Sequence, residues 1–185
     1  MDTLLPQAYL IGITGLLVIV SILVGRQLLK VRNDEVKLIK LEKGGASASK
    51  NAAELYELAS VQLRKRLYPQ ATTTLKKALK QLNDEPNEAK ALIENALGFA
   101  LAAQEDFEAA VSHYRTALKA KPDYPVALNN LAYAKQRLSK ESESFQLYEE
   151  VLAIDPKNKT ATKQLQKLKS KGQDKLENDE NSLGF

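Results

Sequence analysis

Few side chains of this sequence have the types and spacing that catalysis requires. The single histidine, His113, has no second histidine to complete a metal site, so we expect a satisfied or solvent-facing side chain. The paired glutamates, Glu54 with Glu57 and Glu149 with Glu150, fit the solvated face of a helix better than a general acid and base. The glycines form no phosphate-binding loop. We therefore predict a protein that is not an enzyme and uses no cofactor or metal.

The composition narrows the remaining functions. The 185 residues include no cysteine, which excludes disulfides, zinc-thiolate sites and thiol catalysis. Residues 3–25 carry no charge, and all 27 Lys and Arg side chains lie from Arg26 onward. Against 23 Asp and Glu side chains, they give the chain a net charge of +4. This modest excess suits an anionic membrane surface or an acidic protein, and it does not by itself indicate nucleic acid. We expect protein binding, with no nucleic acid and no small-molecule substrate.

A pattern of small and apolar residues recurs every 34 residues, with a degenerate earlier copy. In residues 91–124 its members are Leu97, Gly98, Leu101, Ala110, Tyr114, Ala117 and Pro122. Six of these seven places recur in the next unit, where they hold Leu131, Ala132, Ser144, Tyr148, Val151 and Pro156. The earlier copy has Leu55, Leu58, Ala59, Ala71, Leu75 and Ala78. Small residues allow two helices to cross closely, and larger ones fill the space beside them. The unit resembles the tetratricopeptide repeat, which is a pair of antiparallel helices.

This resemblance implies an all-α fold built from three repeats, at residues 52–85, 91–124 and 125–158, stacked into a right-handed superhelix. Residues 159–171 are predicted to be a capping helix that covers the last apolar face with Ala161, Leu165 and Leu168. The polar, acidic residues 172–185 are predicted to be a disordered tail.

Prolines and an insertion predict where the helices begin and end. The first two units are separated by five residues more than the standard spacing, and the excess falls in residues 83–90. We expect a lengthened first helix in the second repeat, with Pro86 in its first turn. Pro122 and Pro156 are each expected to end a second helix, because the residue before proline disfavours α geometry.

The first helix of each repeat is expected to face a protein-binding groove through its second, fifth, sixth, ninth, twelfth and thirteenth places. Aromatic side chains there can hold an apolar side chain, and the asparagine pair can hydrogen-bond an extended peptide. Packing between repeats is the alternative role of the aromatic residues, and helix capping that of the asparagines. The predicted groove residues are Tyr56, Ser60, Arg64, Asn95, Phe99, Asn129, Asn130, Tyr133 and Arg137.

One well-known kind of tetratricopeptide groove is missing. A subset of these domains grips the acidic C-terminus of heat-shock chaperones with Lys and Asn on the first helix, a second Asn and further basic residues. Those places hold Tyr56, Ser60, Ala96 and Asn130 here. The sequence therefore disfavours an adaptor for chaperone tails.

Residues 1–25 are predicted to be a transmembrane anchor. The apolar run from Leu4 to Gly25 has roughly 20 residues, enough at about 1.5 Å each to cross the hydrocarbon layer. A cleaved signal peptide is the main alternative, but this leader begins with Asp2 and its apolar run is longer than such peptides have. The basic residues Arg26, Lys30 and Arg32 follow the span, so the rest of the chain is expected on the cytoplasmic or equivalent side.

Residues 26–51 are expected to form a basic amphipathic connector, helical to Lys43, followed by a flexible Gly- and Ser-rich linker. A charged helical stalk is the alternative for the helical part. A second basic group, Arg64, Lys65 and Arg66, lies on the first repeat. Because this repeat is nearest the linker, the group is predicted to be membrane-proximal, with plain solvent exposure as the alternative.

The order of these parts resembles a narrower family, the membrane-anchored tetratricopeptide proteins of cyanobacteria and plastids that are associated with photosystem I assembly. The motifs that carry the resemblance are Arg64–Ala71 (RKRLYPQA), Lys77–Lys80 (KALK), Asn95–Phe99 (NALGF) and Leu128–Ala132 (LNNLA). The sequence departs from the family at Lys135 and Glu141, where aromatic or apolar residues are usual.

The resemblance implies a single-pass thylakoid protein, with repeats on the cytoplasmic or stromal side, that helps photosystem I to assemble or remain stable. The partners it implies are photosystem I subunits or assembly factors. Two alternatives stay open: an envelope protein that escorts secreted proteins outside the cytoplasm, and a general scaffold for membrane organisation.

Overall fold

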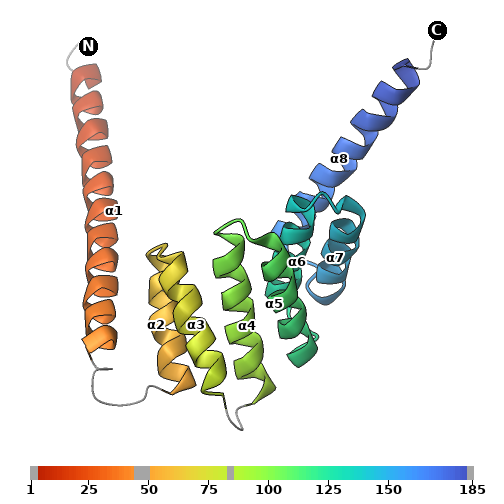
Figure 1. Cartoon of the computed structure of the whole chain (residues 1–185). Helices are drawn as coiled ribbons and strands as arrows, with labels where there is room; N and C mark the ends of the chain where they lie inside the picture. Colours follow the sequence, from red (N-terminus) through yellow and green to blue (C-terminus); the bar gives the residue numbers. More distant parts are fainter. Residues whose placement is uncertain (1–3, 44–50, 83–85, 183–185) are drawn as a thin grey trace. The chain divides into compact units, whose positions relative to one another are not determined.

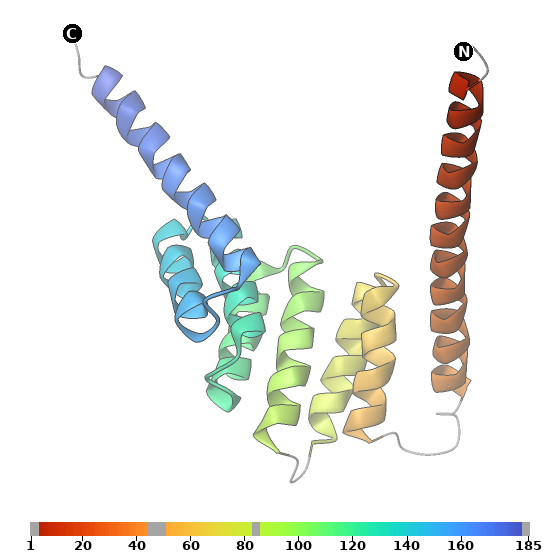
Figure 2. The same ribbon diagram turned by 180° about the vertical axis from the view of Figure 1, so that it is seen from behind.

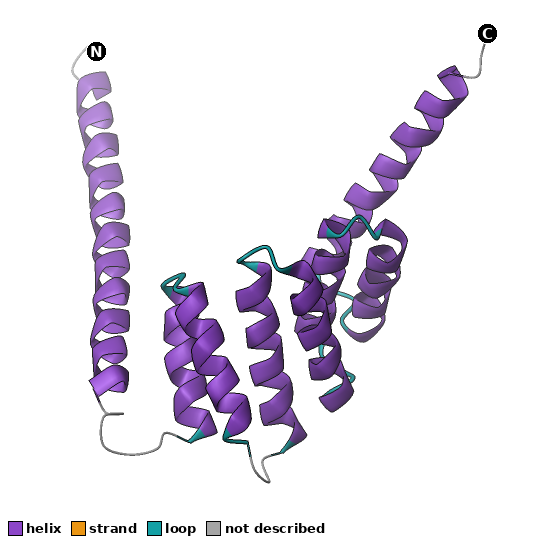
Figure 3. Ribbon diagram, in the orientation of Figure 1, coloured by secondary structure: helices purple, strands orange, loops and turns teal. Residues whose placement is uncertain are grey.

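The computed structural model describes residues 4–43, 51–82 and 86–182. These residues form eight α-helices and, within the described ranges, no strand (Figure 3). The chain divides into two compact units, residues 1–49 and residues 50–185. The predicted linker lies outside the described residues except for Asn51, whose side chain accepts a hydrogen bond from the Glu54 backbone N–H and caps the next helix.

The first unit contains one long helix, α1 (Leu4–Lys43). Its segment Gly12–Lys30 has a mean hydropathy of 1.9 over 19 residues and is not buried within the protein, so it is long and apolar enough to cross a membrane. The helix continues without interruption into the predicted connector. Arg26, Lys30 and Arg32 are exposed on this continuation.

The second unit is a repeat domain in which helices stand side by side in chain order (Figures 1 and 2). Each helix packs against the next, and α2 and α6 also touch α4, so the first helices of the three repeats are neighbours. The helices are α2 (Ala52–Arg64), α3 (Tyr68–Lys80), α4 (Asn87–Ala102), α5 (Phe107–Ala120), α6 (Pro125–Arg137), α7 (Glu141–Ile154) and α8 (Lys159–Ser182).

The small residues of the repeat pattern are buried where the helices of each pair cross. At Gly98 the approach is so close that an added Cβ atom would lie 2.7 Å from Cε1 of Tyr114. Tyr114 and its counterpart Tyr148 are each 1% exposed. Burial raises the pKa of both phenols, that of Tyr148 to about 12. The remaining small residues have no exposed surface: Ala59, Ala71, Ala78, Ala110, Ala117, Ala132, Ser144 and Val151.

The turns inside the three repeats share one backbone conformation, and no glycine in the sequence marks it. Arg66, Glu105 and Ser139 have φ of 60°, 66° and 59°, in the left-handed region that glycine usually occupies. The following residue donates its N–H to the carbonyl five residues back, in the Schellman arrangement that closes a helix end. These three bonds are Leu67 to Gln62 (2.8 Å), Asp106 to Leu101 (3.0 Å) and Lys140 to Lys135 (2.9 Å).

The helix ends follow most of the sequence predictions. Helix α4 has 16 residues against 13 in α2 and α6, so the lengthened helix is confirmed, although Pro86 is its N-cap residue and not in its first turn. Helices α5 and α7 each end two residues before Pro122 and Pro156, and the intervening residues are not helical.

Helix α8 is longer than predicted. It continues through Ser182, so the prediction of a disordered tail from residue 172 is wrong for residues 172–182. Once a helix is nucleated, each further residue adds a hydrogen bond at little cost. Residues 172–182 contain no proline, and five of these eleven residues are good helix formers: Gln173, Lys175, Leu176, Glu177 and Glu180.

The two polar departures in the third repeat form ion pairs between helices. Lys135 is 4% exposed, and its Nζ lies 2.5 Å from Oε2 of Glu143 on α7. This hydrogen bond holds the pKa of the Glu143 carboxyl below its usual value. Glu141 accepts a hydrogen bond from the Lys171 ammonium on α8. These ion pairs link α6 to α7 and α7 to α8.

Candidate protein-binding groove

Four exposed apolar side chains lie on the first helices of the second and third repeats. They are Leu92 and Phe99 on α4, and Val126 and Tyr133 on α6, with exposed fractions of 41%, 44%, 54% and 42%. They occupy the second and ninth places of their repeats, so we call them the apolar quartet. Among the described residues from 51 to 171, the only other large apolar side chain exposed to this degree is Ile154. Exposed apolar side chains gathered on one face mark an interaction surface.

Phe99 and Tyr133 also join one repeat to the preceding one. The ring of Phe99 meets that of Tyr68 edge-to-face, with centroids 6.4 Å apart and an interplanar angle of 73°. Tyr133 meets Phe107 in nearly the same way, at 6.3 Å and 74°. Packing between repeats therefore holds one edge of each ring, while more than two fifths of the side chain stays exposed.

Arg137 is held in place beside Tyr133. Its guanidinium lies 4.5 Å from the centre of the Phe107 ring, donates a hydrogen bond to the Tyr133 hydroxyl at 3.0 Å, and lies 3.7 Å from Oε1 of Glu105. The hydrogen bond to Tyr133 is the main reason that the pKa of Arg137 is raised. Arg137, one of the predicted groove residues, is therefore held at the edge of the groove by these contacts.

The asparagines tie neighbouring repeats together. Nδ2 of Asn130 donates to Oδ1 of Asn95 at 3.0 Å, and Nδ2 of Asn95 donates to the Tyr124 hydroxyl at 3.3 Å. Asn129 donates to Oδ1 of Asn158 at 3.3 Å, and that same oxygen caps the start of α8. One amide N–H of each predicted asparagine is thus used inside the fold. Neither Asn129 nor Asn130 caps a helix, since both lie inside α6.

Tyr56 contributes to a small apolar hollow between α2 and α4. The hollow has a volume of about 180 Å³ and is lined by Ala52, Ala53, Tyr56, Ala89, Leu92 and Ile93. It therefore adjoins one member of the apolar quartet. Ser60 and Arg64 point less clearly to a binding role, because both bond within α2: Ser60 Oγ donates to the Tyr56 carbonyl at 2.8 Å, and Arg64 donates to the Ser60 carbonyl at 3.3 Å.

The two predicted basic groups belong to different units. Arg64, Lys65 and Arg66 lie at the end of α2 and in the turn before α3. The basic residues at 26, 30 and 32 lie on α1. Arg64 and Arg66 are exposed and Lys65 is half-buried.

His113 stabilises a helix pair. Its Nδ1 lies 2.6 Å from Oε2 of the buried Glu94, which joins α5 to α4. Among the described residues no group of three or more His, Cys, Asp or Glu side chains could hold a metal ion.

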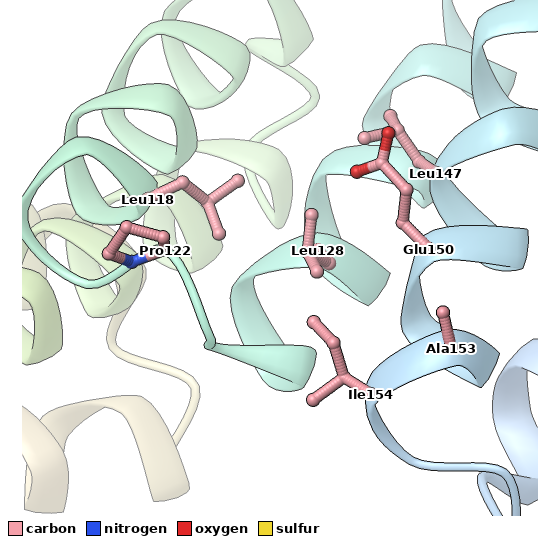
Figure 4. Close-up of a pocket in the computed structure, with 7 residues that line it drawn as sticks. All are labelled: Leu118, Pro122, Leu128, Leu147, Glu150, Ala153 and Ile154. Carbon is pink, nitrogen blue, oxygen red and sulfur yellow. The ribbon is translucent and has the colours of Figure 1, made fainter.

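A second apolar hollow lies between the ends of α5 and α7 and has a volume of about 400 Å³ (Figure 4). Leu118 and Pro122 form one side, Ile154 and Ala153 form the other, and Glu150 carries the charged group of the lining (Figure 4). This hollow does not include any residue of the apolar quartet. Ile154 therefore serves as a matched control position for experiments on the groove.

Sequence reasoning missed half of the apolar quartet. Leu92 and Val126 were not among the predicted residues, although the second place of the repeat was expected to face the groove. Counting in steps of 34 finds both of them. Tyr124 was also missed, and its pKa is raised, mainly by burial and then by the nearby Tyr56, while its bond to Asn95 lowers it. No periodic signal marks Tyr124, because it lies in the loop before α6.

Comparison with known proteins agrees with this geometry. The family description "TPR repeat" matches residues 95–139, and "Tetratricopeptide repeat" matches residues 125–158. The chain is 32% identical over 166 residues to the ycf37 protein of Cyanophora paradoxa, covering 89% of this chain and 95% of that protein. The chain belongs to the ycf37 family.

A longer protein is similar to this ycf37 family member. The tetratricopeptide repeat domain-containing protein PYG7, chloroplastic, of Arabidopsis thaliana is 30% identical over 164 residues, which are 89% of this chain and 54% of PYG7. The chain thus spans about half the length of that relative. Among solved structures, the first TPR of Spaghetti (RPAP3) bound to an HSP90 peptide aligns with a TM-score of 0.59 and 24% identity, over 64% of this chain and 93% of that one. This likeness shows the fold alone.

The fold of this ycf37 family member is therefore all-α, with one N-terminal apolar helix, three tetratricopeptide repeats and a C-terminal capping helix. Tetratricopeptide repeats are protein-binding scaffolds. The relatives include chloroplast and plastid proteins.

Proposed function

We propose that this chain is a non-enzymatic, membrane-tethered scaffold that binds protein partners and assists the assembly or stability of photosystem I. The single observation that carries the binding role is the exposure of the apolar quartet on neighbouring first helices. Membership of the ycf37 family and the chloroplast relative support the link to photosynthetic membranes. The link to photosystem I rests on the family resemblance of the sequence motifs.

In this proposal α1 anchors the chain in the thylakoid membrane by a single span. Exposed Arg26 and Lys30 lie at the C-terminal end of its segment Gly12–Lys30 and exposed Arg32 follows, so the repeats lie on the cytoplasmic or stromal side. An anchor raises the effective concentration of the groove toward partners in or on the same membrane, without any additional contact. Arg64, Lys65 and Arg66 help to align the domain against the anionic surface.

The apolar quartet forms the centre of the binding surface. Arg137, which is bonded to Tyr133, lies at one edge of this surface, and the hollow beside Tyr56 lies at the other. Photosystem I subunits or assembly factors are the proposed partners. The asparagines contribute mainly by holding α4 and α6 in register, because their amide donors bond to neighbouring repeats.

The experiment compares two variants of the full chain in a strain that lacks the native copy. Leu92→Ser with Val126→Ser removes two exposed apolar side chains without disturbing the ring contacts of Phe99 and Tyr133. Affinity recovery from solubilised thylakoids should lose photosystem I subunits or assembly factors, and photosystem I should fall toward the level of the deletion strain. Ile154→Ser, a change of the same kind outside the groove, should behave as the unaltered chain.

Normal photosystem I in the deletion strain would refute the proposed role. Recovery of other membrane proteins in that case would favour a general scaffold. Protease protection of the repeat domain in intact vesicles would contradict the proposed side of the membrane and favour the envelope alternative.

A further inference from the structure

We propose that the groove over α4 and α6 holds an amphipathic α-helix of the partner protein, lying lengthwise along these helices with an uncharged apolar face. The inference rests on the proposed function, since it specifies what the groove binds. It excludes an extended peptide, which is the other way in which such a surface is used. The spacing of the apolar quartet, the state of the asparagines between its members and the absence of charge all point to this occupant.

The spacing of the apolar quartet matches a helix. Leu92 and Phe99 are seven residues apart on α4, as are Val126 and Tyr133 on α6, which corresponds to roughly 10.5 Å along each helix. A partner helix presents residues i and i+7 on one side at the same roughly 10.5 Å spacing. An extended chain presents same-side residues at about 6.7 or 13.4 Å, so it cannot contact both ends of the apolar quartet in register.

The polar groups at the centre of the groove already use part of their hydrogen-bonding capacity inside the fold. Asn95 and Asn130 bond to each other at 3.0 Å between the two ends of the apolar quartet, and Asn95 also bonds to Tyr124. An extended segment leaves its backbone N–H and C=O groups in need of partners, and burying them unpaired is costly. A helix satisfies these groups internally and can lie over the asparagine pair.

The floor of the groove carries no charge. The second, fifth, sixth and ninth places of α4 and α6 hold only apolar and amide side chains: Leu92, Asn95, Ala96, Phe99, Val126, Asn129, Asn130 and Tyr133. A charged side chain pressed onto this floor would lose its water without gaining a counter-charge. The contacting face of the partner helix is therefore uncharged.

The hollow between α2 and α4 gives one end of the partner helix a deeper contact. Its volume of about 180 Å³ exceeds the roughly 150 Å³ of an apolar cavity that holds a benzene ring. The lining residues are apolar apart from the phenol of Tyr56. A leucine- or phenylalanine-sized side chain near one end of the partner helix fits there, beside Leu92.

The test uses the full chain in its native membrane, with the photo-crosslinker p-benzoylphenylalanine as the probe. The probe replaces Leu92 in one variant and Phe99 in another, and mass spectrometry locates the partner residues to which each is joined. A helix lying along α4 gives cross-linked partner residues about seven apart in one segment. Val126→Ser should reduce the yield from the Phe99 position at least several-fold, and a probe at Ile154 should not reach that segment.

Three results would overturn the inference, and they differ in what they imply for the proposed function. Cross-linked residues about three apart, or the same residue reached from both positions, would mean an extended or crossing segment in a groove that still binds a partner. No cross-link to any protein from either position would remove the groove as a binding site and the proposed function with it. A yield unaffected by Val126→Ser also contradicts a helix that touches α4 and α6 together.

Discussion

Replacing Gly98 by alanine should force the buried ring of Tyr114 to move. In Gly98→Ala the new Cβ would lie 2.7 Å from Cε1 and 2.8 Å from Cδ1 of Tyr114, whereas ordinary contact begins near 3.4 Å. The ring must therefore move by about 0.7 Å, although it is 1% exposed and enclosed on all sides. Overpacking of this kind costs about 1–3 kcal/mol. Alanine in place of glycine inside a helix stabilises the folded state by about 0.5–1 kcal/mol.

The net effect of Gly98→Ala is expected to be a loss of about 1 kcal/mol of unfolding free energy, which is the difference between two terms of similar size. The steric effect is isolated by measuring the coupling energy between Gly98→Ala and Tyr114→Leu in the unfolding free energy. In a Tyr114→Leu background the ring is absent, so Gly98→Ala should stabilise by about 0.5–1 kcal/mol through helix propensity alone. The first repeat already pairs Ala59 with Leu75 at the equivalent places.

The assay is denaturant unfolding of residues 50–185, followed by circular dichroism, for the parent, both single variants and the double variant. These residues form a compact unit with their own buried core. We expect a coupling energy of about 1–3 kcal/mol, equal to the overpacking cost. The third repeat places Ala132 against Tyr148, so some relaxation is possible and favours the lower part of this range. An equal effect of Gly98→Ala in both backgrounds would refute the steric explanation.

Three further predictions concern the third repeat. Ser144→Ala should stabilise the domain by about 1 kcal/mol in the same unfolding assay, because the fully buried Oγ has no hydrogen-bond partner among the described residues. Ser139→Gly should raise the unfolding free energy by about 1 kcal/mol, because the left-handed backbone penalises side chains; a loss of stability would contradict this. Glu143→Gln should destabilise the domain, because it leaves the buried Lys135 ammonium without its counter-charge, whereas Lys135→Met should be neutral or stabilising.

The ion pair between Lys135 and Glu143 also predicts a pH dependence. Because the pKa of Glu143 is lower in the folded state than its ordinary value of 4.5, its contribution is fully present above about pH 4.5. The contribution is lost as the pH falls through the lower folded-state value. Thermal unfolding measured from pH 7 to pH 3 should show this loss in the parent and a smaller loss in Lys135→Met. Equal acid sensitivity in both proteins would contradict the assignment.

Local patterns predicted the helices well because they act over short distances. The prolines at 122 and 156 end α5 and α7, since each restricts the residue before it. The turns at Arg66, Glu105 and Ser139 were not predicted, because their left-handed conformation is imposed by the Schellman bonds and carries no glycine signal. The extension of α8 was missed because its composition suits disorder and helix alike.

The candidate groove was predicted less completely, for a physical reason. A period of 34 assigns places to a face of a helix, so it could find Phe99 and Tyr133. It cannot tell whether a polar side chain on that face is free. The bonds of Asn130 to Asn95 and of Asn129 to Asn158 cross between repeats, at sequence separations of 35 and 29 residues.

The sequence by itself therefore determined the period, the small residues at the helix crossings and the apolar N-terminal helix, because these depend on composition and spacing along one helix. Only the tertiary structure decided which side chains of the groove remain available. Stacking of the repeats uses the amides of Asn95, Asn129 and Asn130 and one edge of each ring at Phe99 and Tyr133, and it leaves the apolar quartet exposed. That selection arises from contacts between repeats, which no single unit of 34 residues contains.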